Sequence, residues 1–462
     1  MTLSDALGQP EPRRGLHDRT VHAAVAVVLF AYVLVLRTYD VASTFLMLGE
    51  QTRDWTIALG SLTDLPLLGA PSTAGGRGLG PAYYWLLWLG RVVIGPFTDN
   101  LPHAGGMTVA VLQSIGDAWL FVALARRLPW PLALAASLLI ASGPFDIAIS
   151  SVIWNPPVAD ALIKMALASA LMITPQAPLW RVGQTLALAW MALQCHLSAA
   201  FVAAPLVAGL VLQPLVDDTH DRVRRVIQRA SVVVAVILVL QIPFVLAVLR
   251  EPSAPAGPTT AIANITSGQA FRPFFGLDVV TGVTGNLFLP MESLPFWIPT
   301  LLGGLVVIAA YRRDLVVVGG TIGAVLTMSL VFATWNRSYD GYWFLPMVPS
   351  MVLIFVMGVA AIPMRPAIVA IGVASVAWLA MSQPNRIEAS KRYFEYPQYD
   401  SVVRGSRALV AQAPVVRDIR VSFEVHPTMD RRFVYTILGG RIDPLARYVA
   451  TIDASGAVSL RE

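Results

Sequence analysis

Two carboxylates and a guanidinium crowd into residues 48–55, and they are the side chains best suited to chemistry. If residues 42–60 form a helix at a membrane surface, Glu50 and Asp54 lie one turn apart on the same face, with Arg53 beside them. A carboxylate can act as a general base, and a guanidinium can bind two phosphate oxygens at once. The same spacing also fits a solvated helix face with one ion pair, which is the better interpretation for an arbitrary pattern of this kind.

The composition excludes a soluble enzyme and indicates a membrane protein, so membrane helices must position these residues. The chain of 462 residues is 56% hydrophobic and 13% charged, with a mean hydropathy of +0.65, whereas soluble chains carry about 25% charged residues. The net charge of +5 does not indicate nucleic-acid binding, because the arginines fall in pairs between apolar runs. The single cysteine, Cys195, permits no internal disulfide.

Eleven apolar runs predict eleven transmembrane helices, and hence an all-α polytopic membrane protein. The first run, residues 21–36, should stay as a membrane helix because no small-residue cleavage site follows it. The other ten runs cover residues 107–125, 132–149, 158–173, 183–196, 199–212, 231–249, 296–310, 315–334, 342–362 and 366–381.

Short loops rich in arginine set the orientation, because such loops stay on the cytoplasmic side. With eleven spans all of these loops lie on one side, and they contain Arg13, Arg14, Arg126, Arg127, Arg181, Arg222, Arg224, Arg225, Arg229, Arg312, Arg313 and Arg365. Residues 81–97 must then form a juxtamembrane or re-entrant element and not a further span. We expect a multi-pass protein of the bacterial inner (plasma) membrane, with its N terminus in the cytoplasm and its C terminus in the periplasm.

Three long segments then lie on the outer face: a first loop at residues 37–106 that carries juxtamembrane helices and the active site, a loop at 250–295, and the tail. We divide the chain into a transmembrane domain, 1–381, and a small periplasmic α+β domain, 382–462. The second should contain a helix at 399–413, a strand at 418–423 and a hairpin at 447–460. The Pro-, Gly- and Thr-rich loop 250–295 is either a mobile cover over the site or a passive connector.

Three motifs follow one another in the first loop: the stretch 48–55, the segment 65–72, and Gly78-Leu79-Gly80-Pro81-Ala82-Tyr83-Tyr84-Trp85. Their order resembles the GT-C class of membrane glycosyltransferases, in particular the protein mannosyltransferase and aminoarabinose transferase group. Bacterial members of that group carry a D-Q-x-R-D helix and an L-G-P-x-Y-Y segment. The resemblance covers residues 21–212, with weaker similarity at Trp154-Asn155-Pro156, at 194–197 and at 342–346.

The resemblance implies an inverting transfer of a sugar from a polyprenyl-phosphate donor to an envelope glycan, lipid or protein acceptor on the outer face of the membrane. An acidic residue of the first outer loop is then the general base. Glu50 stands where the family has its first acid, usually Asp, and Asp54 matches the second. We rank Glu50 first and leave Asp54 as the alternative.

The two carboxylates should have unequal roles. Two like charges so close together, partly shielded from water, raise the pKa of one carboxyl group, whereas Arg53 lowers it. One carboxylate would be the base, and the other would orient the acceptor or hold an arginine. No cofactor is expected. A divalent cation held by Glu50 or Asp54 has no support, because no His or carboxylate cluster in the sequence has metal-ligand spacing.

Arg53 and Arg77 are candidates for binding the donor phosphate. The aminoarabinose branch has a lysine just before the proline of its later motif, where this chain has Gly80. A solvated loop charge is an equally good interpretation of Arg77. Asn155 is also a site candidate, because it stands where that branch carries an acid. Asp160, one turn further on, either substitutes for that acid or only pairs with the lysine at i+4.

The remaining candidates for substrate binding are Tyr83, Tyr84, His196, Arg272 and Arg337. The two tyrosines first suggest an interfacial aromatic belt, and second the wall of a site for a prenyl chain or a sugar. His196 either lines the site or is a hydrogen-bonded residue at a helix end. Arg272 is a candidate phosphate contact in the loop 250–295, and Arg337 lies in the short outer connection 336–341.

The alternative function is a transporter or flippase of a lipid-linked glycan, which intramembrane charges along a path would indicate. Few charges lie inside the spans, with Asp117, Asp160, Lys164 and little else, and for Asp117 and its neighbour Gln113 we favour packing between helices. No internal repeat is visible, which counts against transporter folds built from duplicated halves. A non-catalytic scaffold would explain the tail but not the first loop.

Overall fold

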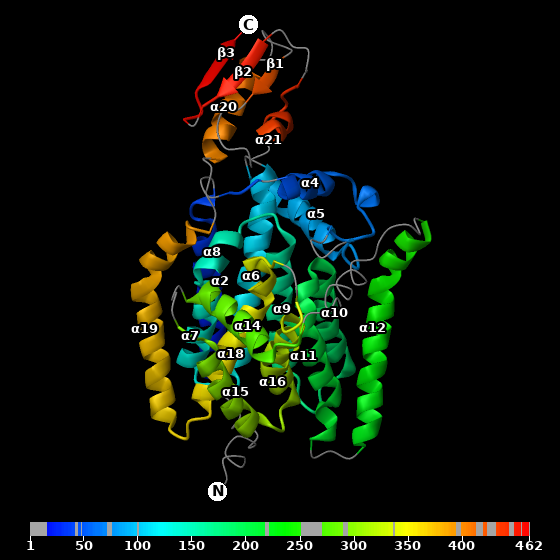
Figure 1. Ribbon diagram of the computed structural model, residues 1–462, viewed down its shortest axis with the longest axis vertical. Coiled ribbons are helices and arrows are strands. Elements are labelled where there is room, and N and C mark those ends of the chain that lie inside the picture. The colour runs from blue at the N-terminus through cyan, green and yellow to red at the C-terminus, as the bar shows by residue number, and fades with distance from the viewer. Residues whose placement is uncertain are drawn as a thin grey trace.

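Apolar helices running between two ends of a bundle make up most of the protein, and a small α+β unit stands on one end (Figure 1). The structure is a computed structural model. It describes residues 16–41, 45–47, 49–71, 76–98, 101–217, 221–250, 270–289, 294–335, 338–393, 399–412, 419–422, 431–442, 448–453 and 455–461.

Except for α14 (Pro273–Phe288), the helices of the bundle follow the apolar runs closely. They are α2 (Leu16–Thr38), α6 (Leu101–Ala125), α7 (Trp130–Ala141), α8 (Pro144–Ile149), α9 (Asn155–Leu171), α10 (Leu179–Cys195), α11 (Ala200–Leu212), α12 (Arg222–Arg250), α14 (Pro273–Phe288), α15 (Trp297–Tyr311), α16 (Leu315–Val318), α17 (Ala324–Phe332), α18 (Val348–Ala360) and α19 (Arg365–Ser390). The π-helical turn η5 (Gly319–Gly323) joins α16 to α17, and short 3-10 turns occur at η1 (Leu62–Asp64), η2 (Gly95–Phe97), η3 (Leu197–Ala199), η4 (Gln213–Leu215) and η6 (Gly341–Met347).

Seven helical stretches of the described chain are long and apolar enough to cross a membrane. They are α2, α6, α11 with its flanking turns, α12, the run from α16 to α17, η6 with α18, and α19. The helices α7, α9, α10 and α15 are shorter, with 12 to 17 residues. A helical membrane protein is therefore confirmed, whereas the total of eleven spans remains a prediction.

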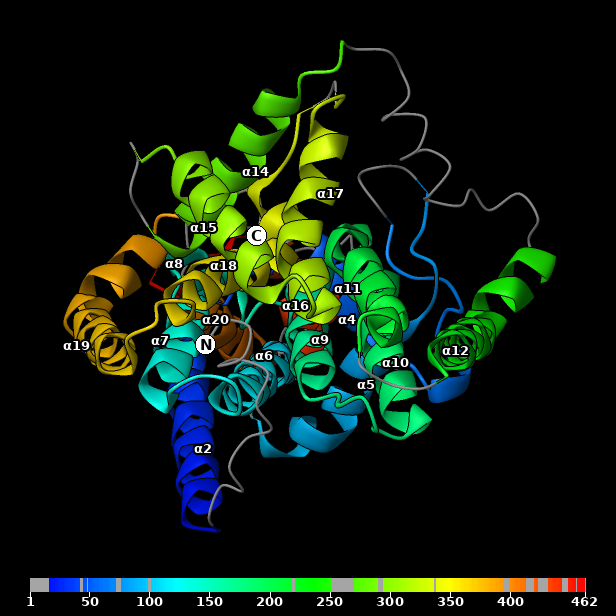
Figure 2. The same ribbon diagram turned by 90° about the horizontal axis from the view of Figure 1, so that it is seen from below.

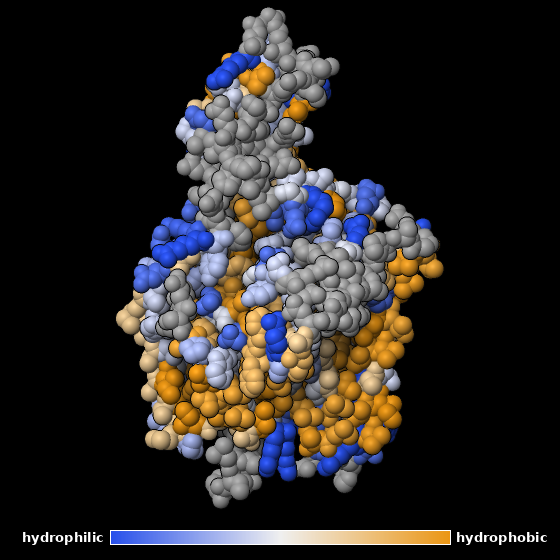
Figure 3. Space-filling model, in the orientation of Figure 1, coloured by the Kyte–Doolittle hydropathy of each residue, from blue (hydrophilic) through white to orange (hydrophobic). Residues whose placement is uncertain are grey.

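The arginine-rich loops gather at one end of the bundle, as their sequence pattern predicts. Arg127, after α6, forms an ion pair with Asp314, just before α16. Gln213, after α11, donates to the carbonyl oxygen of Arg313 at 2.9 Å. Arg225, at the start of α12, donates to the carbonyl oxygen of Pro175, in the turn between α9 and α10. Figure 3 shows hydrophilic residues at this lower end, beneath a broad hydrophobic band.

Two short helices of the first loop lie at the opposite end, α4 (Gly49–Leu59) and α5 (Ala82–Ile94) (Figure 1). Arg91 of α5 donates to the carbonyl oxygen of Leu59 at 3.1 Å and joins the two helices. Gly90 of α5 lies against Thr108 in the first part of α6, at a distance that leaves no room for a side chain. Residues 82–97 therefore form α5 and η2, packed on α4 and α6, and they are not among the seven helical stretches long and apolar enough to cross a membrane.

Within the predicted loop 250–295, residues 273–288 form helix α14. The choice between a mobile cover and a passive connector stays a prediction. Helix α14 is firmly packed. It packs on α17, where Gly276 lies against Ser329 and Ala333, and near its other end Gly285 lies against the ring of Phe296. The Gly- and Thr-rich composition that suggests a loop in the sequence is here the composition of a helix contact. Residues 251–269 lie outside the described part of the chain.

Both ends of α14 lie on the same side of the bundle. The N–H of Arg272 donates to the carbonyl oxygen of Ala333, just after α17. The carbonyl oxygen of Phe288 accepts from Arg386, near the end of α19, which also donates to Ser142 after α7. Since α7, α17 and α19 all end on this side, α14 does not cross from one end of the bundle to the other.

The C-terminal unit has the α+β elements that the sequence predicts. Helix α20 (Tyr399–Gln412) packs on a sheet with the strand order β1-β2-β3, in which β1 (Ile419–Ser422) is parallel and β3 (Val458–Arg461) antiparallel to β2 (Tyr448–Ile452). In the predicted hairpin, Ala450 pairs with Leu460. Helix α21 (Arg431–Ile437) lies beside α20. The proposed boundary at 381/382 falls inside α19, which continues to Ser390.

Two glycines of α14 provide a matched test of this packing. A Cβ at Gly276 would lie 2.0 Å from the carbonyl oxygen of Ser329, whereas a Cβ at Gly282 would have no atom within 4 Å. Gly276→Ala should lower the free energy of unfolding by about 1–3 kcal/mol through overpacking. Gly282→Ala should leave it unchanged or raise it slightly, because alanine favours helix. Thermal midpoints in one detergent measure both effects, and equal shifts would contradict the contact.

Candidate active site

The chain after α4 folds back onto the end of α10 because three glycines leave room for it. The N–H of Gly69 donates to the carbonyl oxygen of Gly78 at 3.1 Å, and Gly78 in turn donates to Ala70 at 3.0 Å. A Cβ at Gly80 would lie 2.4 Å from the side chain of Gln194 in α10. The described parts of this segment, residues 69–71 and 76–80, therefore lie against the C-terminal end of α10.

A narrow recess lies between this segment, the start of α4, the start of α9 and the end of α10. Its lining residues come from five parts of the chain: Glu50, Ala70, Pro71, Gly78, Trp154, Asn155, Leu193, Cys195, His196, Leu197 and Tyr342. Among these, Glu50 is the one carboxylate, and no lysine or arginine of the described chain lines the recess.

Glu50 is held by an aromatic group. Its Oε2 accepts a hydrogen bond from the indole Nε1–H of Trp154 at 3.0 Å. The Trp154 ring packs on Tyr342 with ring centroids 4.4 Å apart, and His196 also meets Tyr342 edge-on, with ring centroids 6.0 Å apart. The recess thus places a carboxylate that can accept a proton beside flat apolar surfaces that suit a sugar ring.

The local sequence explains why these side chains meet. Pro156 and Pro157 occupy the first turn of α9, where proline is favoured, so the helix begins at Asn155 directly after Trp154. The amide of Asn155 donates to the carbonyl oxygen of Cys195 at 2.8 Å and joins the ends of α9 and α10. The Nδ1 of His196 bonds to the Ser198 hydroxyl at 2.7 Å. His196 is therefore hydrogen-bonded at a helix end and also lines the recess, and a role in binding substrate stays a prediction.

Asp54 lies behind the recess and not in it. It is buried in α4, where its Oδ1 accepts from Arg53 at 2.8 Å and from the hydroxyl of Tyr84 at 3.1 Å. Burial raises the pKa of the Asp54 carboxyl group, and the hydrogen bonds from Arg53 and Tyr84 oppose this. One carboxyl group of the pair therefore has a raised pKa, as expected, but the chief cause is burial and not repulsion between the two acids.

Tyr83 and Tyr84 are fully buried, so the aromatic-belt interpretation is wrong for both. They face α4 from α5, while Trp85 on the other face of α5 is 44% exposed. Burial and the neighbouring Asp54 raise the pKa of the Tyr84 hydroxyl, which therefore stays protonated and donates to Asp54. A wall of the recess comes instead from Trp154, whose motif we had noted only as a weak family similarity.

The four arginines predicted to bind substrate differ in where they lie relative to the recess. The side chain of Arg53 is 36% exposed beside Asp54. Arg77 flanks the recess, because it pairs with Pro71 through the backbone and its Nε donates to Gly69 at 3.2 Å. Arg272 is exposed at the start of α14, over the Phe275 ring, and does not line the recess. Arg337 lies outside the described residues.

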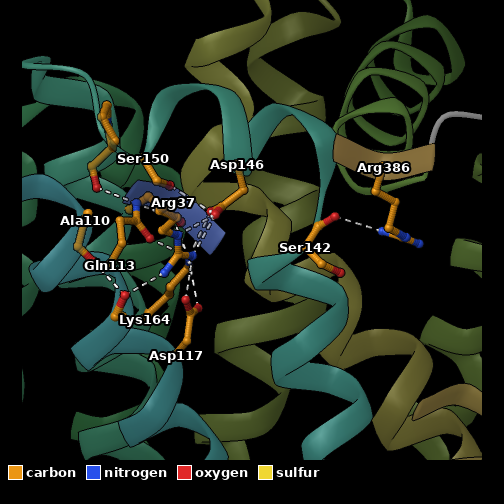
Figure 4. Close-up of polar contacts among 12 residues, drawn as sticks. Arg37, Ala110, Gln113, Asp117, Ser142, Asp146, Ser150, Lys164 and Arg386 are labelled. Carbon is orange, nitrogen blue, oxygen red and sulfur yellow. Dashed lines mark hydrogen bonds and ion pairs between the residues drawn. The ribbon is translucent and has the colours of Figure 1, made fainter. Parts of the chain in front are cut away.

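The intramembrane polar residues bind one another, which confirms packing between helices for Asp117 and Gln113. Asp117 lies 2.6 Å from the guanidinium of Arg37 (Figure 4). Gln113 donates to Asp160 at 3.0 Å. Asp160 pairs with Lys164 at 3.0 Å and is buried away from the recess, so it does not substitute for an acid at Asn155.

Comparison with known proteins gives similarity in structure without similarity in sequence. No protein-family model matches the sequence, and no curated protein matches it significantly. The solved structure of ArnT from Cupriavidus metallidurans bound to undecaprenyl phosphate superimposes with a TM-score of 0.58 at 15% identity, covering 92% of this chain and 85% of ArnT. The apo structure of the same protein gives 0.56 at 14% identity, with 90% and 84% covered.

The chain has the GT-C fold. The match includes most of the chain, and so extends beyond residues 21–212, where the sequence resemblance lies. Within the GT-C fold of this protein, the recess at Glu50 lies at the end of the bundle that carries α4 and α5. In the described residues, no group of three or more His, Cys, Asp or Glu side chains has the arrangement of a metal site.

Asp54 should make the stability of this protein depend on pH. Its pKa is higher in the folded protein than the ordinary value of about 4. The folded state therefore binds that proton more tightly, and stability from this group falls as the pH rises above about 4. Asp54→Asn should remove this loss, so its thermal midpoint relative to the parental protein should increase with pH.

Thermal midpoints of both proteins in one detergent, from about pH 4 to about pH 8, test this. Asp64→Asn, which removes an exposed carboxylate of the same loop, is the matched control. A difference between Asp54→Asn and the parental protein that does not change with pH would show that Asp54 is not desolvated.

Proposed function

We propose that this protein is an inverting glycosyltransferase that moves a sugar from a polyprenyl-phosphate donor to an envelope glycan, lipid or protein acceptor. The reaction would take place on the outer face of the bacterial inner membrane. The observation that carries the proposal is the position of Glu50, an acid in an aromatic-walled recess at one end of a bundle with the GT-C fold. A fold alone does not define a reaction. The donor class is supported by the undecaprenyl phosphate bound to ArnT.

In the proposed reaction Glu50 accepts the proton that the acceptor loses. The hydroxyl oxygen or amine nitrogen of the acceptor attacks the anomeric carbon of the sugar from the face opposite the phosphate. The new bond forms as the bond from carbon to phosphate oxygen breaks, and the phosphate leaves with the electron pair. The hydrogen bond from Trp154 holds the Glu50 carboxylate in one orientation for this transfer.

The donor phosphate would bind at the rim of the recess, because no described basic residue lines its interior. Arg77 is beside the rim residues Pro71 and Gly78, and its guanidinium suits phosphate oxygens. Arg53 is half-buried against Asp54 and can help from the other side. We therefore assign the base to Glu50, and to Asp54 the role of holding Arg53 and Tyr84.

A transporter or flippase is the alternative, and the arrangement of intramembrane charge does not favour it. Asp117, Asp160 and Lys164 do not follow a path across the bundle. They meet in one buried cluster, in which each carboxylate touches a cation.

The proposal includes eleven membrane crossings, with α4, α5, α14 and the C-terminal unit on the outer side. It rests on the arginine-rich loops at one end of the bundle. Reporter fusions at Arg127, Arg225 and Glu462 should place the first two in the cytoplasm and the third in the periplasm. A cytoplasmic Glu462 would show that the number of crossings is even, and a periplasmic Arg127 would reverse the first spans.

Glu50→Gln should lower turnover by about a hundredfold or more, because the amide cannot accept the proton. Binding of the donor should be largely kept, since the recess keeps its shape. Cells that carry the variant should accumulate the unused donor, and mass spectrometry of membrane lipids would identify its sugar and prenol.

Two matched variants make this experiment specific. Asp64→Asn removes an exposed acid of the same loop and should transfer sugar at the parental rate. Arg77→Ala should weaken donor binding more than turnover. If Glu50→Gln and Asp54→Asn both transfer sugar at the parental rate, the first loop is not the active site, and the proposed reaction loses its main support.

A further inference from the structure

Five ionisable side chains from four helices meet inside the bundle, and Figure 4 labels four of them, Arg37, Asp117, Asp146 and Lys164. They are Arg37 of α2, Asp117 of α6, Asp146 of α8, and Asp160 and Lys164 of α9, and we call them the charge cluster. Their side chains are between 0 and 4% exposed. The reaction proposed for Glu50 makes no use of any of them.

Each cation of the charge cluster touches more than one carboxylate. Arg37 lies 2.6 Å from an oxygen of Asp117 and 2.6 Å from an oxygen of Asp146. The ammonium group of Lys164 lies 3.0 Å from Asp117, 3.2 Å from Asp146 and 3.0 Å from Asp160. The other polar side chains in direct contact are neutral, namely Gln113, Ser114 and Ser150.

The charges of the cluster do not balance if every group is ionised. Arg37 carries its proton under all conditions, and Lys164 keeps its proton because three carboxylates surround it. Two positive charges therefore face three carboxylates. The charged side chains that act on these groups are the members of the cluster themselves. An uncompensated charge inside a membrane protein is strongly unfavourable, and the usual outcome is that one group becomes neutral.

Asp160 has the least compensation among the three acids. Asp146 accepts two hydrogen bonds from Arg37 and one each from Ser150 and Lys164. Asp117 binds both Arg37 and Lys164, and its Oδ1, although not hydrogen-bonded, lies 3.0 Å from the Lys164 ammonium. Both partners of Asp160 are on Oδ2, and its buried Oδ1 has no partner among the described residues.

We propose that the charge cluster is a proton-binding site, and that Asp160 carries the proton on Oδ1. The cluster then has two positive and two negative charges and is electrically neutral. A neutral carboxyl group at Asp160 can stay buried without a second cation. The site would hold this proton at neutral pH, independently of the reaction at Glu50.

An isosteric substitution tests the proposal. Asn is close in shape to a protonated Asp, so Asp160→Asn should keep the parental thermal midpoint and yield of folded protein. Asp117→Asn and Asp146→Asn each remove a charged partner of Arg37, and both should lower the midpoint by several degrees or prevent folding. Asp314→Asn, in the partly exposed ion pair with Arg127, should have a small effect and serves as the control.

Infrared spectroscopy of the full-length protein in lipid nanodiscs detects the proton directly. At neutral pH the parental protein should show the C=O stretching band of a protonated carboxylic acid, displaced on transfer to D2O. This band should be lost in Asp160→Asn and kept in Asp54→Asn and Asp314→Asn. Because Asp160 is not part of the proposed active site, the result does not depend on the sugar-transfer assay.

Three results would overturn the proposal. The band could persist in Asp160→Asn, or Asp160→Asn could destabilise the protein as much as Asp117→Asn. Third, the parental protein could lack the band, and its thermal unfolding midpoint could rise when sodium replaces choline at constant ionic strength. In that case a sodium ion, and not a proton, supplies the missing charge.

Discussion

Ionisable side chains inside a membrane bundle are tolerated only where they bind one another. This constraint fixes the relative positions of the four helices that contribute to the charge cluster. Arg37 must reach Asp117 and Asp146 at once, which joins α2 to α6 and α8. Lys164 adds α9, a helix whose side chains are almost all buried. Seen from below, α9 lies in the interior, whereas α2, α12 and α19 lie at the periphery (Figure 2).

The candidate site depends on this arrangement because α9 supplies two residues of the recess. Trp154 and Asn155 stand at the start of α9, and they reach Glu50 and the end of α10 by hydrogen bonds. A second buried contact, from Tyr84 to Asp54, holds α4 on α5. The position of Glu50 is therefore fixed by its own helix, α4, and by the hydrogen bond from the indole of Trp154. A base positioned in this way can accept a proton without first being reorganised.

Much of the fold could be predicted from the sequence, because hydropathy and arginine placement act locally. The backbone N–H and C=O groups of an apolar run inside a membrane must bond to one another, so the run forms a helix wherever it packs. Arginine-rich loops remain on one side of the membrane. The alternating pattern at 447–460 likewise predicted the hairpin in which Ala450 pairs with Leu460. Helix α14 was missed because its glycines and threonines have the composition of a loop, and only contact with α17 shows that they pack.

The sequence by itself determined a polytopic helical protein with a chemically suited pair, Glu50 and Asp54, at a juxtamembrane helix. Only the tertiary structure decided which of the two faces the recess, because their separation along α4 allows either orientation. Asp54 turns to Tyr84 and is buried, and Glu50 meets Trp154, which is 104 positions away in the sequence. Contacts between such distant residues depend on how whole helices pack, and no local pattern of residues encodes them.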